Sequence, residues 1–221
     1  VLIRYASEIY ELGADESLGT LSDAERLCLR AIDVLENCVR RDPGVQRHRS
    51  ELAYASKVLG DIYLDRSDLQ PARENLHRAL EIYRELVRGS PRDKKVRRLF
   101  SVTSVTWGQL LQDSGDMDAA ANSFREAVAM LEELRAEFPG DLLLQEGLIE
   151  AIEKHAEFHE ERKDIAAAGQ LFARARRLTD ECVADNPNDP IRLTIASIYY
   201  LEFADFAFRC GNLEDARDLF E

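Results

Sequence analysis

The chain lacks the signals of a membrane protein and of a β-sheet protein. No apolar run approaches the roughly 20 residues that a membrane-spanning helix needs. The amino-terminal segment VLIRYASEIYEL is too polar and acidic for a signal peptide. No hairpin turn separates alternating apolar runs anywhere in the 221 residues. These absences predict a helical chain that has no membrane partner.

Cysteine is scarce, with four residues in the whole chain. Their positions indicate neither a disulfide framework nor the paired spacing of a zinc site. Cys28, Cys38 and Cys182 fall at positions of the internal repeat, described below, that hold Leu or Phe in other units, so we expect small buried side chains. Cys210 shares its position with Arg and Ser, so we expect it to be exposed. This use of cysteine is typical of a reducing, cytoplasmic compartment.

Catalytic signatures are also missing. The sequence holds no glycine-rich phosphate loop, no nucleophile elbow and no Ser/His/Asp or Cys/His set in supporting context. His155 and His159 lie one helical turn apart, as metal-binding pairs do. Other repeat units place Leu, Tyr or Trp at these positions, which favours histidines packed in a core. We therefore predict no enzyme activity, no cofactor and no metal site.

Acidic residues outnumber basic ones, but unevenly along the chain. The formal net charge is −13, with +6 over residues 40–100 and −14 over residues 101–221. Such asymmetry concerns association more than fold. The acidic majority argues against nucleic acid as the main partner, because a nucleic-acid-binding surface must neutralise phosphates.

The chain does contain a 48-residue repeat. Prolines 43, 91, 139 and 187 recur at that interval, and small residues keep step with them. Three columns are Gly60, Gly108, Ala156 and Ala204; Ala24, Ala72, Ala120, Ala168 and Ala216; and Ala31, Ala79, Ala127 and Ala175. A side chain larger than Ala would hold apart two helices that cross closely. Repeats of this length predict a solenoid in which each unit packs mainly on its neighbours.

We predict five helical hairpins. The units are approximately residues 1–43, 44–91, 92–139, 140–187 and a truncated 188–221. Helices are expected over 1–12, 21–41, 45–64 and 69–88, in hairpins 94–137 and 141–184, and from Pro190 onward, with Thr20 and Asp68 as N-caps. The chain has no initiator Met and ends early in its fifth unit. We therefore expect a fragment of a longer protein.

The columns resemble the tetratricopeptide repeat (TPR), in which a large apolar residue precedes Gly or Ala, followed by an aromatic three residues on and then by Ala-x3-Phe. Two copies read Leu59-Gly60…Tyr63…Ala72…Leu76 and Trp107-Gly108…Leu111…Ala120…Phe124. The usual unit has 34 residues. The difference equals two heptads, one per helix, so the apolar stripes stay nearly in phase.

The resemblance implies a right-handed superhelix that binds protein or peptide on its concave face. Units lengthened in this way are similar to the helical tails of some bacterial signalling proteins, including serine/threonine kinases. We expect a protein-interaction scaffold. An alternative is a regulatory or sensor segment acting in cis on a kinase or protease domain outside this chain.

In the tetratricopeptide pattern, the first helix of each hairpin lines the groove. The fourth hairpin carries five glutamates on that face, at i, i+4, i+7, i+11 and i+14: Glu146, Glu150, Glu153, Glu157 and Glu160. The matching residues elsewhere are Tyr54, Lys57, Asp61, Val105, Gln109, Gln112, Leu201, Asp205 and Phe208. We hypothesise an acidic strip beside apolar groove walls, suited to a basic amphipathic peptide. The alternative is a solvated helix face without function.

Self-association is a third expectation. It follows from the truncated last unit, which would leave aromatic side chains partly uncovered. These side chains are Phe203, Phe206, Phe208 and Phe220.

Overall fold

The computed structural model describes residues 21–211, which contain eight α-helices and no strand. The helices are α2 (Leu21–Arg41), α3 (Gln46–Asp65), α4 (Leu69–Gly89), α5 (Lys94–Asp113), α6 (Met117–Glu137), α7 (Leu142–Glu161), α8 (Ile165–Asp185) and α9 (Pro190–Arg209). The predicted all-α fold is confirmed. The expected helix over 1–12, the cap Thr20 and the residues Ala216 and Phe220 lie outside the described residues. None of the helices between residues 21 and 211 is long and apolar enough to cross a membrane.

The sequence period is reproduced in the helix boundaries. The even-numbered helices each have 21 residues and begin at Leu21, Leu69, Met117 and Ile165. The odd-numbered helices each have 20 residues and begin at Gln46, Lys94, Leu142 and Pro190. Both series advance by 48 residues per unit, so each repeat encodes one helix of each kind.

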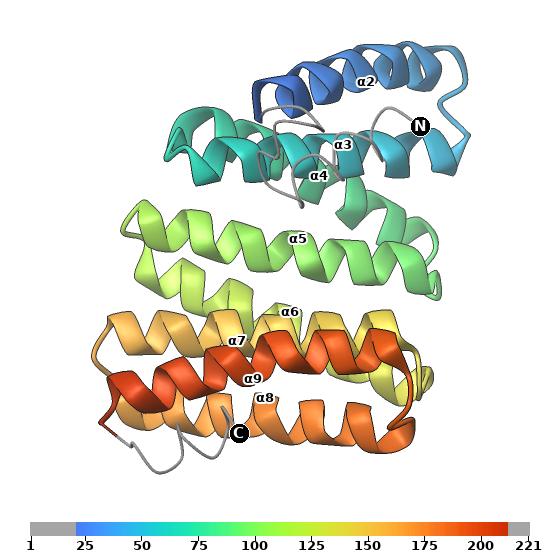
Figure 1. The fold of residues 1–221 in the computed structure, drawn as a ribbon. Coiled ribbons are helices and arrows are strands. Elements are labelled where there is room, and N and C mark those ends of the chain that lie inside the picture. Colours follow the sequence, from blue (N-terminus) through green and yellow to red (C-terminus); the bar gives the residue numbers. More distant parts are fainter. Residues whose placement is uncertain (1–20, 212–221) are drawn as a thin grey trace. The chain divides into compact units, whose positions relative to one another are not determined.

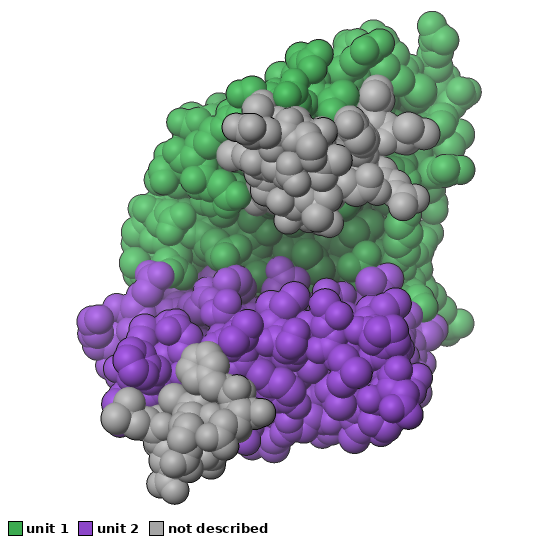
Figure 2. Space-filling view, in the orientation of Figure 1, with its two compact units in different colours: residues 1–123 green, residues 124–221 purple. Residues whose placement is uncertain are grey.

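The chain divides into two compact units, with the boundary after Ser123 (Figure 2). In the first unit, α3 packs against α2 and α4, and α4 packs against α5. In the second unit, α8 packs against α7 and α9. Consecutive helices within each unit run antiparallel and are joined by short turns (Figure 1). Contacts between sequence neighbours are the pattern of a repeat array.

Small residues occupy the helix crossings, as the columns predicted. A Cβ atom added to Gly60 of α3 would lie 2.6 Å from Cγ of Leu76 on α4, closer than two carbon atoms can approach. In the next column, Ala72, Ala120 and Ala168 have no exposed surface. The apolar side chains around these crossings form the core. One cluster joins Ala24, Cys28, Ala31 and Ile32 of α2 to Leu52, Ala55, Val58, Leu59 and Ile62 of α3.

Each of helices α3, α5, α7 and α9 is followed by a residue in the left-handed region. The φ angles are 59° at Ser67, 82° at Gly115, 63° at Lys163 and 77° at Gly211. The backbone N–H of Asp68 then donates to the carbonyl of Tyr63 at 2.8 Å, which is a Schellman-type helix end. Asp116 and Asp164 make the same bond to Leu111 and His159. One residue therefore ends the first helix and begins the second.

Asp68 stands at the N-cap position of α4, as predicted, but its side chain does not make the expected capping hydrogen bond. The side chains of Asp93, Asp141 and Asp164 each accept a hydrogen bond from the backbone N–H three residues on, whereas the side chain of Asp68 accepts none. The residue three positions after Asp68 is Pro71, which has no N–H to donate. The proline that suits the first turn of α4 thus removes one of the two N–H donors that a cap side chain can use.

We predict that Asp164→Ala lowers the free energy of unfolding by about 1 kcal/mol, because the N–H of Ala167 loses its partner. Asp68→Ala should cost clearly less, because it breaks no side-chain cap. Urea unfolding of both variants checks this. Equal losses in the two variants would contradict the role given to Pro71.

We predict that Gly60→Ala destabilises the protein relative to Gly89→Ala by about 1–3 kcal/mol, because the added methyl group displaces Leu76. Gly89, at the exposed end of α4, has nothing within 4 Å of an added Cβ, so it supplies the matched control. Both changes gain helix propensity, and the comparison isolates the steric effect. Thermal or urea unfolding is the measurement. Equal stability of the two variants would show that the α3–α4 crossing tolerates a side chain.

Candidate partner-binding surface

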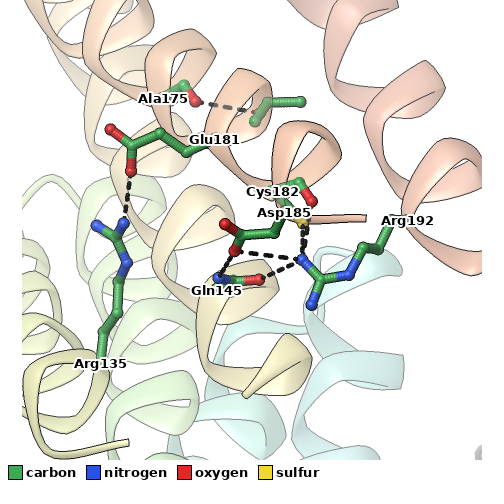
Figure 3. A network of polar contacts seen from close by, with 8 residues as sticks. Arg135, Gln145, Ala175, Glu181, Cys182, Asp185 and Arg192 are labelled. Carbon is green, nitrogen blue, oxygen red and sulfur yellow. Dashed lines mark hydrogen bonds and ion pairs between the residues drawn. The ribbon is translucent and has the colours of Figure 1, made fainter. Parts of the chain in front are cut away.

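Helices α7, α8 and α9 are joined by a largely buried arginine (Figure 3). The Arg192 side chain of α9 is 11% exposed. Its Nη1 donates to the backbone carbonyl of Cys182 on α8 at 2.8 Å and to Oε1 of Gln145 on α7 at 3.2 Å. The same nitrogen lies 3.6 Å from Oδ2 of Asp185, which also accepts from Gln145 Nε2 at 3.3 Å. One guanidinium therefore fixes three helices at their common end.

Two further contacts hold α9 beside α7. The guanidinium of Arg209 donates two hydrogen bonds to the Glu160 carboxylate, at 2.8 and 3.0 Å. This bidentate pair is a strong form of charge-assisted contact. Nearer the start of both helices, the hydroxyl of Tyr199 lies 3.5 Å from the backbone carbonyl of Glu146. These contacts bracket the stretch of α7 that carries Glu150, Glu153 and Glu157.

The five predicted glutamates do not form a uniformly solvated face. Glu153 is only 4% exposed, and the other four are half-buried. Both oxygens of Glu157 accept from Nζ of Lys154, at 2.8 and 2.9 Å, and Glu160 is held by Arg209. The sequence could not show this burial, because it arises from the packing of neighbouring helices against α7 and not from the residue type. The unpaired acidic charge of the strip is therefore smaller than the sequence pattern suggests.

Glu153 has an unusual protonation equilibrium. Burial raises the pKa of its carboxyl to about 8. Lys154 opposes the shift, and the negative charges of Glu157, Glu202 and Glu150 add to it. Near neutral pH the protonated form of this side chain is therefore favoured, in contrast to an ordinary surface glutamate.

Sequence reasoning missed Glu202, which extends the acidic group onto α9. One carboxylate oxygen from each of Glu153, Glu157 and Glu202 lies within 4.8 Å of the others. Glu202 directly follows Leu201, which shares the repeat column of Glu153. Repeat columns describe one helix face at a time, so they do not show which side chains of two neighbouring helices meet. Only the side-by-side packing of two successive first helices brings position 202 to positions 153 and 157.

The predicted residues of the second and third hairpins lie in the first unit. Lys57 and Asp61 form an ion pair at 2.7 Å, in which the carboxylate side chain is 8% exposed. Val105 is buried, and Tyr54 is half-buried against the core. Gln109 and Gln112 are also half-buried. These residues remain candidates for contact with a partner, but Lys57, Asp61 and Val105 offer little accessible surface.

Helix α9 presents an exposed apolar stripe. Ile198, Leu201 and Phe208 are 55, 55 and 60% exposed and follow a helical spacing. Asp205 is exposed on the same face and pairs with Arg209. Isolated apolar side chains are common on surfaces, but a row along one helix is typical of an interaction site. We call Ile198, Leu201 and Phe208 the α9 stripe.

One aromatic residue expected to be partly uncovered, Phe203, is buried. Phe203 is 3% exposed, and Phe206 is half-buried. The ring of Phe206 lies 4.2 Å from that of Phe172 on α8, centroid to centroid. Helix α8 therefore covers Phe203 and part of Phe206, which stays partly uncovered as expected, and Phe208 is exposed.

The histidine pair packs as expected. His155 is 8% exposed, and its ring stacks on Phe124 with centroids 5.8 Å apart. Burial, with help from His159 and Arg125, lowers the pKa of His155 to about 4. Nδ1 of His159 lies 3.4 Å from Oδ2 of Asp164. Cys28 and Cys182 are buried and Cys210 is exposed, as predicted, whereas Cys38 is half-buried.

Comparison with solved structures supports the fold. The chain is similar to BtubC from P. vanneervenii, with a TM-score of 0.63 and 16% identity over 91% of this chain and 71% of that one. It is also similar to the apo form of RapI, with a TM-score of 0.59 and 11% identity over 99% and 79% of the two chains. No protein-family model and no curated protein matches the chain. At these identities the likeness concerns the fold alone, an all-α helical repeat array.

The raised pKa of Glu153 predicts a pH-dependent loss of folding stability. In the unfolded chain this carboxyl ionises near 4.5, whereas in the folded protein it ionises near 8. Stability is therefore unaffected below pH 4.5, falls as the pH rises from 4.5 to 8, and stays reduced above that. Removing the ionisable group should remove this loss.

We expect Glu153→Gln to raise the free energy of unfolding by roughly 1–3 kcal/mol at pH 8, with little change at pH 4.5. Urea unfolding in chelator at both pH values is the measurement. Glu126→Gln on α6, an exposed position, is the control and should show no such difference. An equal effect of Glu153→Gln at both pH values would mean that its ionisation is not suppressed by folding.

Proposed function

We propose that this protein is an interaction scaffold whose second unit binds a basic amphipathic segment of a protein partner. The α9 stripe supplies the apolar contact, and the carboxylates of α7 and α9 supply the charge contact. The observation that carries the proposal is the exposure of three large apolar side chains, each more than half accessible, on one face of α9. Glu202 is exposed on the same helix, and Glu150 and Glu157 are half-buried on α7.

The surface matches a common mode of peptide recognition. An amphipathic helix places apolar anchors at i, i+3, i+4 and i+7 into a groove, while its charged residues contact the rim. A partner with basic residues on its polar face would meet complementary charge here, which favours fast and selective association. The proposed partner is therefore a protein or peptide rather than a nucleic acid, which the acidic charge would repel.

The fold agrees with a scaffold role. Stacked helices hold their side chains on rigid elements, so binding orders little of the scaffold and the ordering cost falls on the partner. Arg192 and Arg209 add rigidity, because they fix α9 to its neighbours at both ends. The second unit thus presents a preformed surface, and repeat arrays use extended surfaces of this kind for binding.

We predict that Leu201→Ser with Phe208→Ser abolishes capture of the partner from lysate of the source cell, because it removes the apolar anchors. Both positions are more than half exposed, so folding should be preserved. The matched control is Leu143→Ser with Ile165→Ser, which alters two exposed apolar residues of the same unit outside the stripe. Mass spectrometry of the captured proteins, at low and high salt, is the measurement.

A charge series separates the two kinds of contact. Glu150→Gln with Glu157→Gln should weaken capture and reduce its salt dependence. The equivalent change on α6, Glu126→Gln with Glu133→Gln, should leave both unchanged. The proposal fails if the captured set is the same for the stripe variant and its control. A mass that rises with concentration in light scattering would favour self-association, and the lack of any specific partner would favour the in-cis regulatory role.

A further inference from the structure

We propose that Glu153, Glu157 and Glu202 form a binding site for a hard divalent cation, with Ca²⁺ as the ion of best fit. The site lies between α7 and α9 of the second unit. This inference does not depend on the proposed partner, because it concerns a ligand that the chain would bind alone.

The geometry comes from three carboxylates on two helices. Glu153 and Glu157 are four residues apart, so they project from neighbouring turns of α7. Glu202 approaches from α9, and one oxygen of each residue lies within 4.8 Å of the others. Two oxygens bound to the same Ca²⁺ at 2.3–2.6 Å are separated by at most about 5 Å. The three ligand atoms are thus already close enough to share one ion.

The environment of Glu153 indicates that a ligand binds here. Its residue is 96% buried, and the cation that acts on its carboxyl group, the Lys154 ammonium, is hydrogen-bonded to Glu157. Buried carboxyl groups are normally paired, hydrogen-bonded or bound to a metal. A cation between Glu153, Glu157 and Glu202 would supply the missing partner.

The helices that carry the ligands are held in place on both sides of the site. Arg209 binds Glu160 beyond one end, and the hydroxyl of Tyr199 approaches the carbonyl of Glu146 beyond the other. The spacing between α7 and α9 is therefore set by contacts that do not involve the three ligands. A preformed spacing of this kind reduces the cost of assembling a coordination sphere.

The donor set selects the class of ion. All three ligands are carboxylate oxygens, with no imidazole or thiolate among them, which favours Ca²⁺, Mg²⁺ or Mn²⁺ over zinc or copper. Mg²⁺ requires a regular octahedron at 2.0–2.1 Å, whereas Ca²⁺ accepts longer and less regular spacings. Lys154 competes with the ion, because its ammonium group binds both oxygens of Glu157. Removal of this lysine should therefore strengthen cation binding.

The test uses the whole 221-residue chain, stripped with chelator and titrated with CaCl₂ by isothermal calorimetry in the absence of any partner. We expect one Ca²⁺ per chain and weaker binding of Mg²⁺. Glu153→Gln and Glu202→Gln should each lower the affinity about tenfold or more, and Lys154→Met should raise it several-fold. Glu126→Gln, with the same change of charge at an exposed site, should change the affinity less than about twofold.

Thermal melting by circular dichroism shows that each variant is folded. The proposal is overturned if the wild-type chain binds no Ca²⁺ up to about 10 mM, roughly tenfold above the weak end of protein calcium sites, which is about 1 mM. It is also overturned if Glu153→Gln and Glu126→Gln lower the affinity equally, which would indicate diffuse screening. Binding of an arginine-rich peptide that is lost in Glu153→Gln, without Ca²⁺ binding, would instead assign the carboxylates to a basic partner. That outcome would leave the proposed function standing.

Discussion

The close crossing of neighbouring helices is the constraint on which this structure depends. It requires a residue no larger than alanine at fixed positions, and Gly60 shows how little space is available, with Leu76 in the place of its missing side chain. Because the helices begin at 48-residue intervals, a small residue recurs at the matching position of each repeat, and Ala72, Ala120 and Ala168 are all buried. Large apolar residues then fill the volume around the small ones. The same local packing arrangement is therefore repeated along the array.

The same packing changes the character of the residues on α7. A row of glutamates would be a solvated stripe on an isolated helix, but α9 lies alongside it and contributes Glu202 to the acidic group around Glu153. Arg192 and Arg209 fix that arrangement through contacts to three helices. The exposed face of α9 then becomes the apolar surface of the second unit. Its position beside the carboxylates links the proposed partner site to the proposed cation site.

Sequence reasoning predicted the features that repeat and missed those that depend on neighbours. The helix boundaries, the turns and the buried alanines follow from periodicity, because each unit supplies an independent copy of the same signal. The side chain of Asp68 makes no capping bond because Pro71, which has no N–H, occurs in this repeat and not in the repeats of Asp116 and Asp164. Phe203 was expected to be uncovered and is buried under α8. Glu202 was missed because its role arises only when two helices one repeat apart lie side by side.

Contact between the α9 face and a partner is the central claim to test. A photo-crosslinking amino acid placed at position 201 of the full chain, with the captured partner present, tests it. We expect a covalent adduct from position 201 and none from position 165, which is exposed on the same unit outside the stripe. Adducts from position 165 but not from position 201 would place the partner elsewhere and contradict the account.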